Sequence, residues 1–176
     1  MRKVIAYTDG SAVVKGKSKG NGGFGTYFPD LYGEKKAFSA GFKETKTGRM
    51  ELTALYYAIA AIDKTNPTHL VVYSDSEYVV KSFTEGRLKR WIKAGWKNTA
   101  GEVKNKDIWS KIVEALSDRK DLVLTMKHIR SHQVDKEKNK DIKKELMKDP
   151  NIIGNMMADR LANYKRHGLL LDSDKI

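Results

Sequence analysis

Residues 49–76 read RMELTALYYAIAAIDKTNPTHLVVYSDS, and one hydrophobic period gives way to another within them. In residues 49–63 the apolar positions recur at helical spacing and predict a helix with a broad buried face. These positions are Met50, Leu52, Leu55, Ala58, Ile59 and Ile62. Asn66-Pro67 ends the pattern, because proline cannot donate the backbone hydrogen bond that a helix requires. Residues 70–74 form a continuous apolar run, which is typical of a central strand buried on both faces.

The remaining elements extend outward from this helix and strand. Three earlier strands are expected at residues 3–8, 26–28 and 36–42, with a loop over residues 11–22 and a turn around Pro29-Asp30. Later residues predict helices at 76–83, 107–116 and 155–164, a strand at 122–129 and a helix cap at Gly168. This order predicts an α/β fold with a five-stranded mixed sheet flanked by helices. We expect one domain over residues 1–168 and a C-terminal tail over residues 169–176.

The charge balance indicates a polyanionic partner. The 176 residues include 34 Lys and Arg against 22 Asp and Glu, a net charge of +12, although basic residues can also serve solubility alone. The absence of cysteine excludes disulfides and thiolate metal sites. No apolar run approaches the ~20 residues of a membrane span, and the N-terminus lacks the features of a secretion signal. We therefore expect a cytoplasmic protein, and a monomer.

Two glycine patterns resemble phosphate-binding motifs without fitting them. Gly20–Gly25 matches GxGxxG, but a Lys-rich loop precedes it and a strand follows, whereas the dinucleotide motif needs a strand before it and a helix after it. Gly16-Lys17-Ser18 resembles a phosphate loop, but the first glycine, Gly10, is one residue out of register. Neither pattern predicts a nucleotide site.

Carboxylates stand at the ends of predicted elements. Asp9 follows the first strand and Asp75 follows the buried strand, so the two reach one crevice if those strands are parallel neighbours. Glu51 and Asp159 interrupt largely apolar helical segments, where a carboxylate needs solvent or a cation. Taken singly, each acid is better explained by a structural role: Asp9 as a turn residue, Asp75 as the N-cap of the next helix, Glu51 as a partner of the helix dipole and Asp159 as an ion-pair partner of Arg160. Together they would repel one another, and a pair of Mg²⁺ ions would remove that repulsion.

Four short segments, in this order, resemble the motifs of type 1 ribonucleases H. They are Thr8-Asp9-Gly10-Ser11, Arg49-Met50-Glu51-Leu52, Ser74–Val79, and Gly154-Asn155 with Ala158–Ala162. The resemblance covers nearly the whole chain and implies a ribonuclease H-like fold. It further implies an endonuclease that hydrolyses the RNA strand of RNA–DNA hybrids and leaves 5′-phosphate and 3′-hydroxyl ends. The implied ligands of two Mg²⁺ ions, which Mn²⁺ can replace, are Asp9, Glu51, Asp75 and Asp159.

Two histidines compete for the catalytic histidine that the resemblance implies. Aligning Ile129-Arg130-Ser131-His132 with the strand-end pattern of the family places this role at His132. His128 then lies inside the strand, where we expect a packed or hydrogen-bonded imidazole. A zinc site made by the pair would lack a helix and further ligands.

The resemblance also suggests where substrate binds. Residues 87–107 resemble a basic protrusion that holds the DNA strand by its phosphates, although a solvated helix face is the alternative. Its candidate contacts are Lys89, Arg90, Trp91, Lys93, Trp96 and Lys97. Trp91 and Trp96, like Trp109, are large aromatic residues that must pack or stack. Other candidates are Gly10, Ser11, Asn21, Thr45, Thr47 and Arg49. The chain departs from the family at residues 45–48 and at Glu77, where an amide is common, so discrimination between RNA and DNA stays open.

Residues 133–153 make a longer segment than the family usually has at this place. Lysines and acids recur there with period four and predict a helix over about residues 135–148, which Pro150 ends. A solvated spacer and a lid or substrate clamp both remain open as roles of this segment.

Two other functions of the chain also remain open: a DNA-cutting relative such as a resolvase or integrase core, and a non-catalytic hybrid-binding module. The second would predict a broken set of acids, whereas all four are present.

Overall fold

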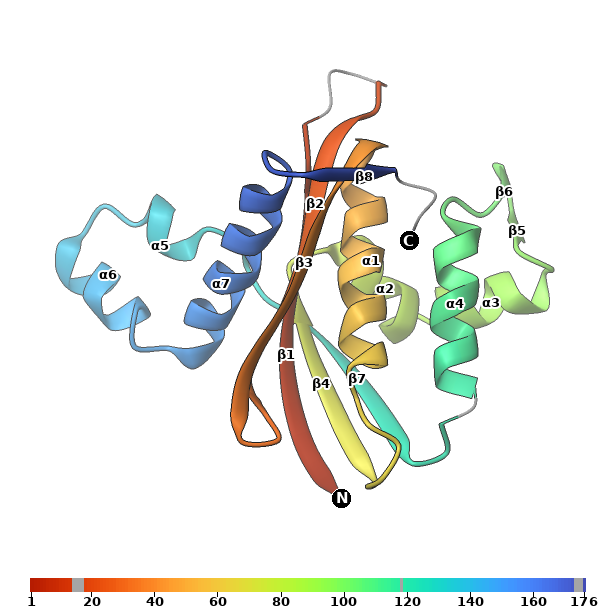
Figure 1. Ribbon diagram of the computed structural model, residues 1–176, viewed down its shortest axis with the longest axis horizontal. Coiled ribbons are helices and arrows are strands. Elements are labelled where there is room, and N and C mark those ends of the chain that lie inside the picture. Colours follow the sequence, from red (N-terminus) through yellow and green to blue (C-terminus); the bar gives the residue numbers. More distant parts are fainter. Residues whose placement is uncertain (14–17, 118, 173–175) are drawn as a thin grey trace.

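A six-stranded sheet forms the centre of the computed structural model, with helices on both faces (Figure 1). The structure describes residues 1–13, 18–117, 119–172 and 176. The strands follow the order β7-β4-β1-β2-β3-β8. Their bounds are β1 Arg2–Ala12, β2 Gly20–Leu31, β3 Glu34–Thr45, β4 Thr68–Ser74, β7 Leu122–His128 and β8 Leu170–Asp172. β1, β2 and β3 are antiparallel, whereas β4 and β7 continue the sheet in parallel with β1.

The mixed α/β sheet is confirmed, but the prediction of five strands is wrong. The sixth strand, β8, pairs in parallel with Gly41–Lys43 of β3, although the sequence placed it in a tail. Three residues are too few to show a strand period, and only the β3 edge makes this segment extended. Gly168 precedes β8 without capping the helix: α7 ends at Lys165 with Arg166 as its cap, and Gly168 has no left-handed backbone.

β1, β2 and β3 are longer than predicted. The glycine-rich residues 20–25 look like a loop by composition, but they pair with both β1 and β3. The β2–β3 turn lies at Tyr32-Gly33, where φ is +61° and +92°, and not at Pro29-Asp30. The Asp30 side chain accepts the Gly33 N–H at 2.7 Å, so the aspartate supports the turn from its flank. Residues 14–17, part of the predicted loop, lie outside the described residues.

The helices form two layers that differ in how they pack. Their bounds are α1 Thr47–Ala60, α2 Glu77–Thr84, α3 Arg87–Lys93, α4 Lys106–Ser117, α5 Gln133–Lys136, α6 Lys140–Leu146 and α7 Pro150–Lys165. α1 and α4 cover one face of the sheet and α7 covers the other (Figure 1). A small hairpin of β5 (Lys97–Asn98) and β6 (Gly101–Glu102) follows α3. Among the described residues, no helix is long and apolar enough to cross a membrane.

The apolar core lies on the α1 face. Leu52, Leu55 and Ile59 of α1 are almost completely buried there against Leu70 and Val72 of β4. These are the positions that the helical and continuous apolar patterns single out. The predicted helix and buried strand around residues 49–74 are therefore confirmed as the centre of the core.

α7 packs on the opposite face through glycines. A Cβ on Gly25 would lie 2.3 Å from the Ala158 carbonyl oxygen, and one on Gly23 would lie 2.4 Å from that of Ala162. Real side chains do not fit at such distances, so these glycines bring the helix backbone against the sheet. The glycine pattern of residues 20–25 thus serves helix–sheet packing, which agrees with the rejection of a dinucleotide motif.

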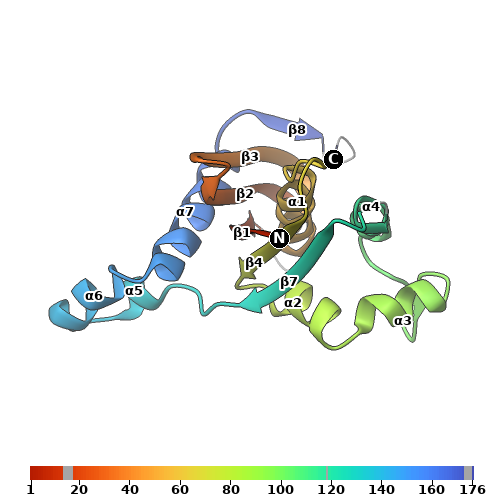
Figure 2. The ribbon, with the colours of Figure 1, turned by 90° about the horizontal axis from the view of Figure 1, so that it is seen from below.

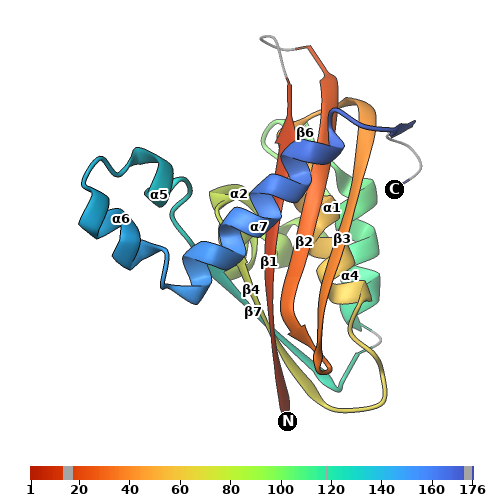
Figure 3. The ribbon, with the colours of Figure 1, turned by 60° about the vertical axis from the view of Figure 1, so that its left-hand side comes forward.

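The segment before α7 forms an arm of two short helices (Figure 3). The predicted continuous helix over residues 135–148 is wrong, because the chain leaves helical geometry after Lys136. Asn139 then caps α6 by accepting the N–H groups of Asp141 at 2.9 Å and Ile142 at 3.2 Å. No residue of α6 is buried. Pro150 begins α7 at its first turn, five residues before the predicted start.

Candidate active site

The parallel pairing of β1 and β4 brings two of the predicted acids together. Thr8 pairs with Ser74 in the ladder, so Asp9 and Asp75 come directly after neighbouring positions. β4 stops at Ser74, which opens the sheet beyond its C-terminal end. Asp9 is 6% exposed, and its carboxylate accepts the Gly10 N–H at 2.7 Å.

α1 brings Glu51 to the same place because Gly10 has no side chain. A Cβ on Gly10 would lie 2.2 Å from the Glu51 backbone nitrogen, so the helix passes directly over the strand. One carboxylate oxygen from each of Asp9, Glu51 and Asp75 lies within 4.8 Å of the other two. Three elements that are distant in sequence therefore meet in one acidic cluster.

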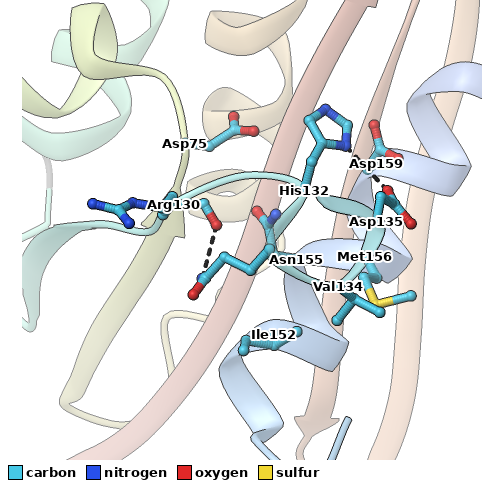
Figure 4. Close-up of a pocket in the computed structure, with 10 residues that line it drawn as sticks. Asp75, Arg130, His132, Val134, Asp135, Ile152, Asn155, Met156 and Asp159 are labelled. Carbon is cyan, nitrogen blue, oxygen red and sulfur yellow. Dashed lines mark hydrogen bonds and ion pairs between the residues drawn. The ribbon is translucent and has the colours of Figure 1, made fainter. Parts of the chain in front are cut away.

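α7 adds the fourth acid. The Asp159 carboxylate lies close enough to Asp9 for its charge to raise the Asp9 pKa, and it accepts the Asn163 Nδ2–H at 2.6 Å. Asp159 and Asp75 also line a pocket with His132 and Asn155 (Figure 4). The structure thus gathers all four predicted acids, with Asp159 beside the group of three.

Burial and mutual repulsion disfavour the charged forms of Asp9, Glu51 and Asp75. Burial, and then the charges of Asp75 and Asp159, raise the pKa of Asp9 from 3.8 to about 9 against the opposing Gly10 hydrogen bond. Burial and the neighbouring Asp9 and Asp75 also raise the pKa of Glu51 well above its ordinary value. Burial and Asp159 raise the pKa of Asp75, which His132 partly offsets. A bound cation would stabilise the ionised forms that the protein alone disfavours.

The donor set fits a hard divalent cation. All the converging ligand atoms are carboxylate oxygens, which Mg²⁺ and Mn²⁺ prefer. The Glu51 Oε2 atom is buried and has no hydrogen-bond partner in the described part of the chain. Burying a carboxylate oxygen costs folding free energy unless a hydrogen-bond donor or a cation lies beside it. The cluster could therefore bind a metal ion.

The two histidines have different surroundings. His132 lines the pocket with Asp75 and Asp159, and its side chain is 48% exposed. His128 is the last residue of β7, and its Nε2 atom lies 3.2 Å from the Asp75 carbonyl oxygen. The expected hydrogen bond of the His128 ring is therefore present, but the residue is exposed and not packed.

Asn155 is a pocket residue for which the sequence predicts no role. Its side chain is 5% exposed and faces the pocket beside Asp159, one helical turn away on α7 (Figure 4). The Asn155 Oδ1 atom has no partner among the described residues. A buried amide oxygen at this place is available to an incoming donor. The motif that contains Asp159 begins with this residue, and that was the available signal.

Some of the predicted substrate residues belong to elements that also carry or adjoin the acids: Gly10 and Ser11 lie in β1, and Thr47 and Arg49 lie in α1. Ser11 is the penultimate residue of β1, and its hydroxyl donates to the Asn163 Oδ1 atom at 3.0 Å and accepts from the Arg166 guanidinium at 2.6 Å. Thr45 lies in a hollow with Gly48 and Arg49, and its buried Oγ1 atom has no partner among the described residues. Thr47 begins α1 and Asn21 lies in β2 beside a second hollow.

Arg49 has a protein partner already. Its guanidinium donates two hydrogen bonds to the Asp107 carboxylate at 2.9 and 2.7 Å, and these lower the pKa of Asp107. This bidentate pair ties the start of α1 to α4. The sequence did not indicate this partner, because the two residues are 58 positions apart.

The basic protrusion consists of α3 and the β5–β6 hairpin, on the opposite side of the molecule from α5 and α6 (Figure 2). Lys89, Arg90 and Lys93 lie on α3 and Lys97 in β5, all exposed. The tryptophans face inward. Trp91 packs against Trp109 with ring centroids 5.7 Å apart, and Trp96 packs on the main core.

Comparisons with known proteins agree with this geometry. The RNase H family model matches residues 1–166. A ribonuclease H of Lachnoclostridium phytofermentans is 43% identical over 118 residues, which cover 64% of this chain and 72% of the relative. The solution structure of the PFV RNase H domain superposes with a TM-score of 0.65 at 25% identity and covers 93% of this chain and 94% of that one.

A second solved structure shows the same fold at lower identity. It is the crystal structure of LC11-RNase H1 in complex with an RNA/DNA hybrid, with a TM-score of 0.59 and 23% identity. The match covers 98% of this chain and 97% of that one. With its acidic cluster and its match over residues 1–166, the chain belongs to the ribonuclease H family, a family of nuclease hydrolases.

Proposed function

We propose that this chain is an endonuclease that hydrolyses the RNA strand of RNA–DNA hybrids and leaves 5′-phosphate and 3′-hydroxyl ends. One observation carries the proposal: Asp9, Glu51 and Asp75 place carboxylate oxygens within 4.8 Å of one another. Family membership and a structural relative solved with an RNA/DNA hybrid support the choice of substrate. Such a cluster costs folding energy and therefore calls for a function.

Asp9, Glu51, Asp75 and Asp159 would hold two divalent ions, Mg²⁺ or Mn²⁺. When bound, such ions supply an activated water and charge stabilisation for in-line displacement at phosphorus. The chain itself contributes the spacing of the acids, which is set by β1, the end of β4, α1 and α7. His132 lies in the same pocket and would accept or donate a proton at its ring nitrogen near the leaving group.

The substrate would lie across the acids, between the basic protrusion and the arm formed by α5 and α6. Lys89, Arg90, Lys93 and Lys97 are exposed on the protrusion and would neutralise phosphates of the DNA strand. Trp91 and Trp96 pack inward, so we assign them to supporting the protrusion and not to stacking on bases. Contacts of this kind bind without sequence preference.

Recognition of the RNA strand would use groups beside the acids. Thr45 ends β3, Thr47 begins α1, and Gly10 and Ser11 are the last residues of β1 before Ala12. Hydroxyl and backbone groups at these positions, with Asn21 across the β1–β2 pair, can bond a 2′-hydroxyl as donor or acceptor. The buried, unpartnered Thr45 Oγ1 atom supports this choice, within the part of the chain that the structure describes.

Cleavage of an end-labelled RNA–DNA hybrid with Mg²⁺ tests the proposal. Single-stranded RNA, duplex RNA and duplex DNA are the controls, and a phosphate label identifies the ends. We expect cleavage of the hybrid RNA alone and its loss in Asp9→Asn and Asp159→Asn. Cleavage of duplex DNA at the same rate would instead support a DNA-cutting nuclease. Hybrid binding without cleavage would support a binding module.

A further inference from the structure

His132 is held by the arm that follows it. Its backbone has φ +52°, a left-handed conformation that non-glycine residues adopt rarely. This conformation turns the chain directly into α5, where the His132 carbonyl oxygen accepts the Lys136 N–H at 3.1 Å. The strain must be offset by surrounding contacts, so the backbone of the histidine and the start of the arm form one unit.

The arm also reaches the imidazole ring. The His132 Nδ1 atom lies 3.3 Å from the Asp135 Oδ2 atom, the contact drawn as a dashed line in Figure 4. Hydrogen bonds at catalytic residues are often long before substrate binds and tighten afterwards. A carboxylate at Nδ1 favours the tautomer with the proton on Nδ1. That tautomer leaves Nε2 free to accept a proton.

α5 is fixed to the helix that carries Asp159. Val134, between His132 and Asp135, is only 4% exposed and lines the pocket with Ile152 and Met156 of α7 (Figure 4). α6, by contrast, buries no side chain. The first turn of the arm is therefore anchored beside the acids, whereas its second helix projects outward (Figure 3).

We propose that Asp135 is a positioning residue, which orients the His132 ring and sets its tautomer for the reaction. The other charged side chains of this pocket are Asp75, Arg130 and Asp159. Within the described part of the chain, none of these three has a hydrogen bond to the His132 ring. Asp135 belongs to the long segment after His132, so part of that segment acts on the site and is more than a spacer. The proposal rests on the proposed hydrolysis, which His132 would serve.

The first test needs no activity. In metal-free protein labelled with ¹⁵N at histidine, the ring nitrogens of His132 report which atom carries the proton. We expect the Nδ1–H tautomer in the unmodified chain and in Asp135→Asn, whose amide oxygen still accepts a hydrogen bond. Asp135→Ala should give a mixture of tautomers. The matched control is Asp141→Asn, an exposed acid on α6, which should leave the spectrum unchanged. An unchanged tautomer in Asp135→Ala would overturn the proposal.

The second test separates positioning from binding. Asp135→Ala should lower kcat for hybrid cleavage about tenfold with little change in KM, as the loss of groups that orient active-site ligands commonly does. Asp135→Asn should retain most of the rate, because orientation needs an acceptor and not a charge. Equal losses in both variants, or a loss confined to KM, would refute positioning. If the unmodified chain cleaves no hybrid, the proposed function fails, whereas the tautomer result still decides the role of Asp135.

Discussion

Asp9→Asn should make the metal-free protein more stable, although it removes a proposed catalytic group. The carboxylate is buried beside Asp75 and Asp159, which raises its pKa from 3.8 to about 9. Asparagine removes the charge and keeps an oxygen that can accept the Gly10 N–H. The substitution therefore removes an electrostatic penalty and leaves the local hydrogen bond in place.

The magnitude follows from proton linkage. An acid whose pKa is raised in the folded state binds its proton more tightly there, so stability falls as pH rises from 3.8 toward about 9. At about pH 7 this difference covers roughly three pH units at ~1.4 kcal/mol each, an upper limit of about 4 kcal/mol. Because neighbouring acids share the same protons, we expect a gain of about 2 kcal/mol in the free energy of unfolding at this pH.

Urea unfolding with a chelator present, repeated across this pH range, measures the gain. The difference between Asp9→Asn and the unmodified chain should be smallest below pH 3.8 and should grow until about pH 9. Mg²⁺ should stabilise the unmodified chain more than the variant and narrow the difference. A gain that does not change with pH, or a loss of stability at neutral pH, would refute the electrostatic reasoning.

Asp63→Asn is the matched control with the opposite sign. Hydrogen bonds from Thr65 and Arg2 lower the pKa of Asp63 to about 2. Its contribution is present above the ordinary value of 3.8 and is lost as pH falls toward about 2. Asp63→Asn should therefore be less stable than the unmodified chain at neutral pH, and equally stable in strong acid.

Four further substitutions test the site and its surroundings. Gly10→Ala places a methyl group 2.2 Å from the Glu51 nitrogen, so it should lower the free energy of unfolding by about 2 kcal/mol and reduce hybrid cleavage. His132→Ala should lower kcat about 100-fold in a cleavage assay, whereas His128→Ala, whose ring bonds only a backbone carbonyl, should retain most of it. Lys93→Gln should raise KM and weaken the salt dependence of binding, with kcat unchanged.

Each of these has a control or a contradicting outcome. Gly48→Ala meets only Tyr78 ring atoms at 3.9 Å and should be tolerated, so equal damage from both glycine substitutions would argue against the close approach of α1. A kcat loss at His128 that exceeds the loss at His132 would reverse the assignment. For Lys93, the control is Lys35→Gln on β3, which should leave the salt dependence of hybrid binding unchanged.

The sequence predicts the parts of the fold that depend on periodicity. α1 and β4 appear where their apolar patterns place them, because burial of one helical face or of both strand faces leaves a local signature. β8 and the glycine-rich part of β2 leave none, because β8 depends on the β3 edge and Gly23 and Gly25 on the approach of α7. The break after Lys136 was missed because charge periodicity continues through it.

The candidate site likewise combines features that local sequence patterns indicate with features that depend on tertiary contacts. Each acid taken alone is better explained by a local structural role, and only the resemblance to a family makes the four acids a set. Their convergence depends on the β1–β4 register and on the contact between Gly10 and α1, which no local pattern shows. In the sequence Asp135 stands only at the start of the predicted helix, outside the repeating rows of lysines and acids. Its contact with His132 needs the left-handed turn at that residue.

The glycine-mediated packing of α7 has a consequence for how the protein is made. Asp9, Glu51 and Asp75 all precede α2, but Asp159 belongs to the last helix and reaches them only when that helix lies against Gly23 and Gly25. A chain leaving the ribosome therefore carries an incomplete set of acids until α7, Pro150–Lys165, has been synthesised. Nascent chains would stay inactive toward nearby RNA, and the appearance of cleavage during translation would time the docking of α7.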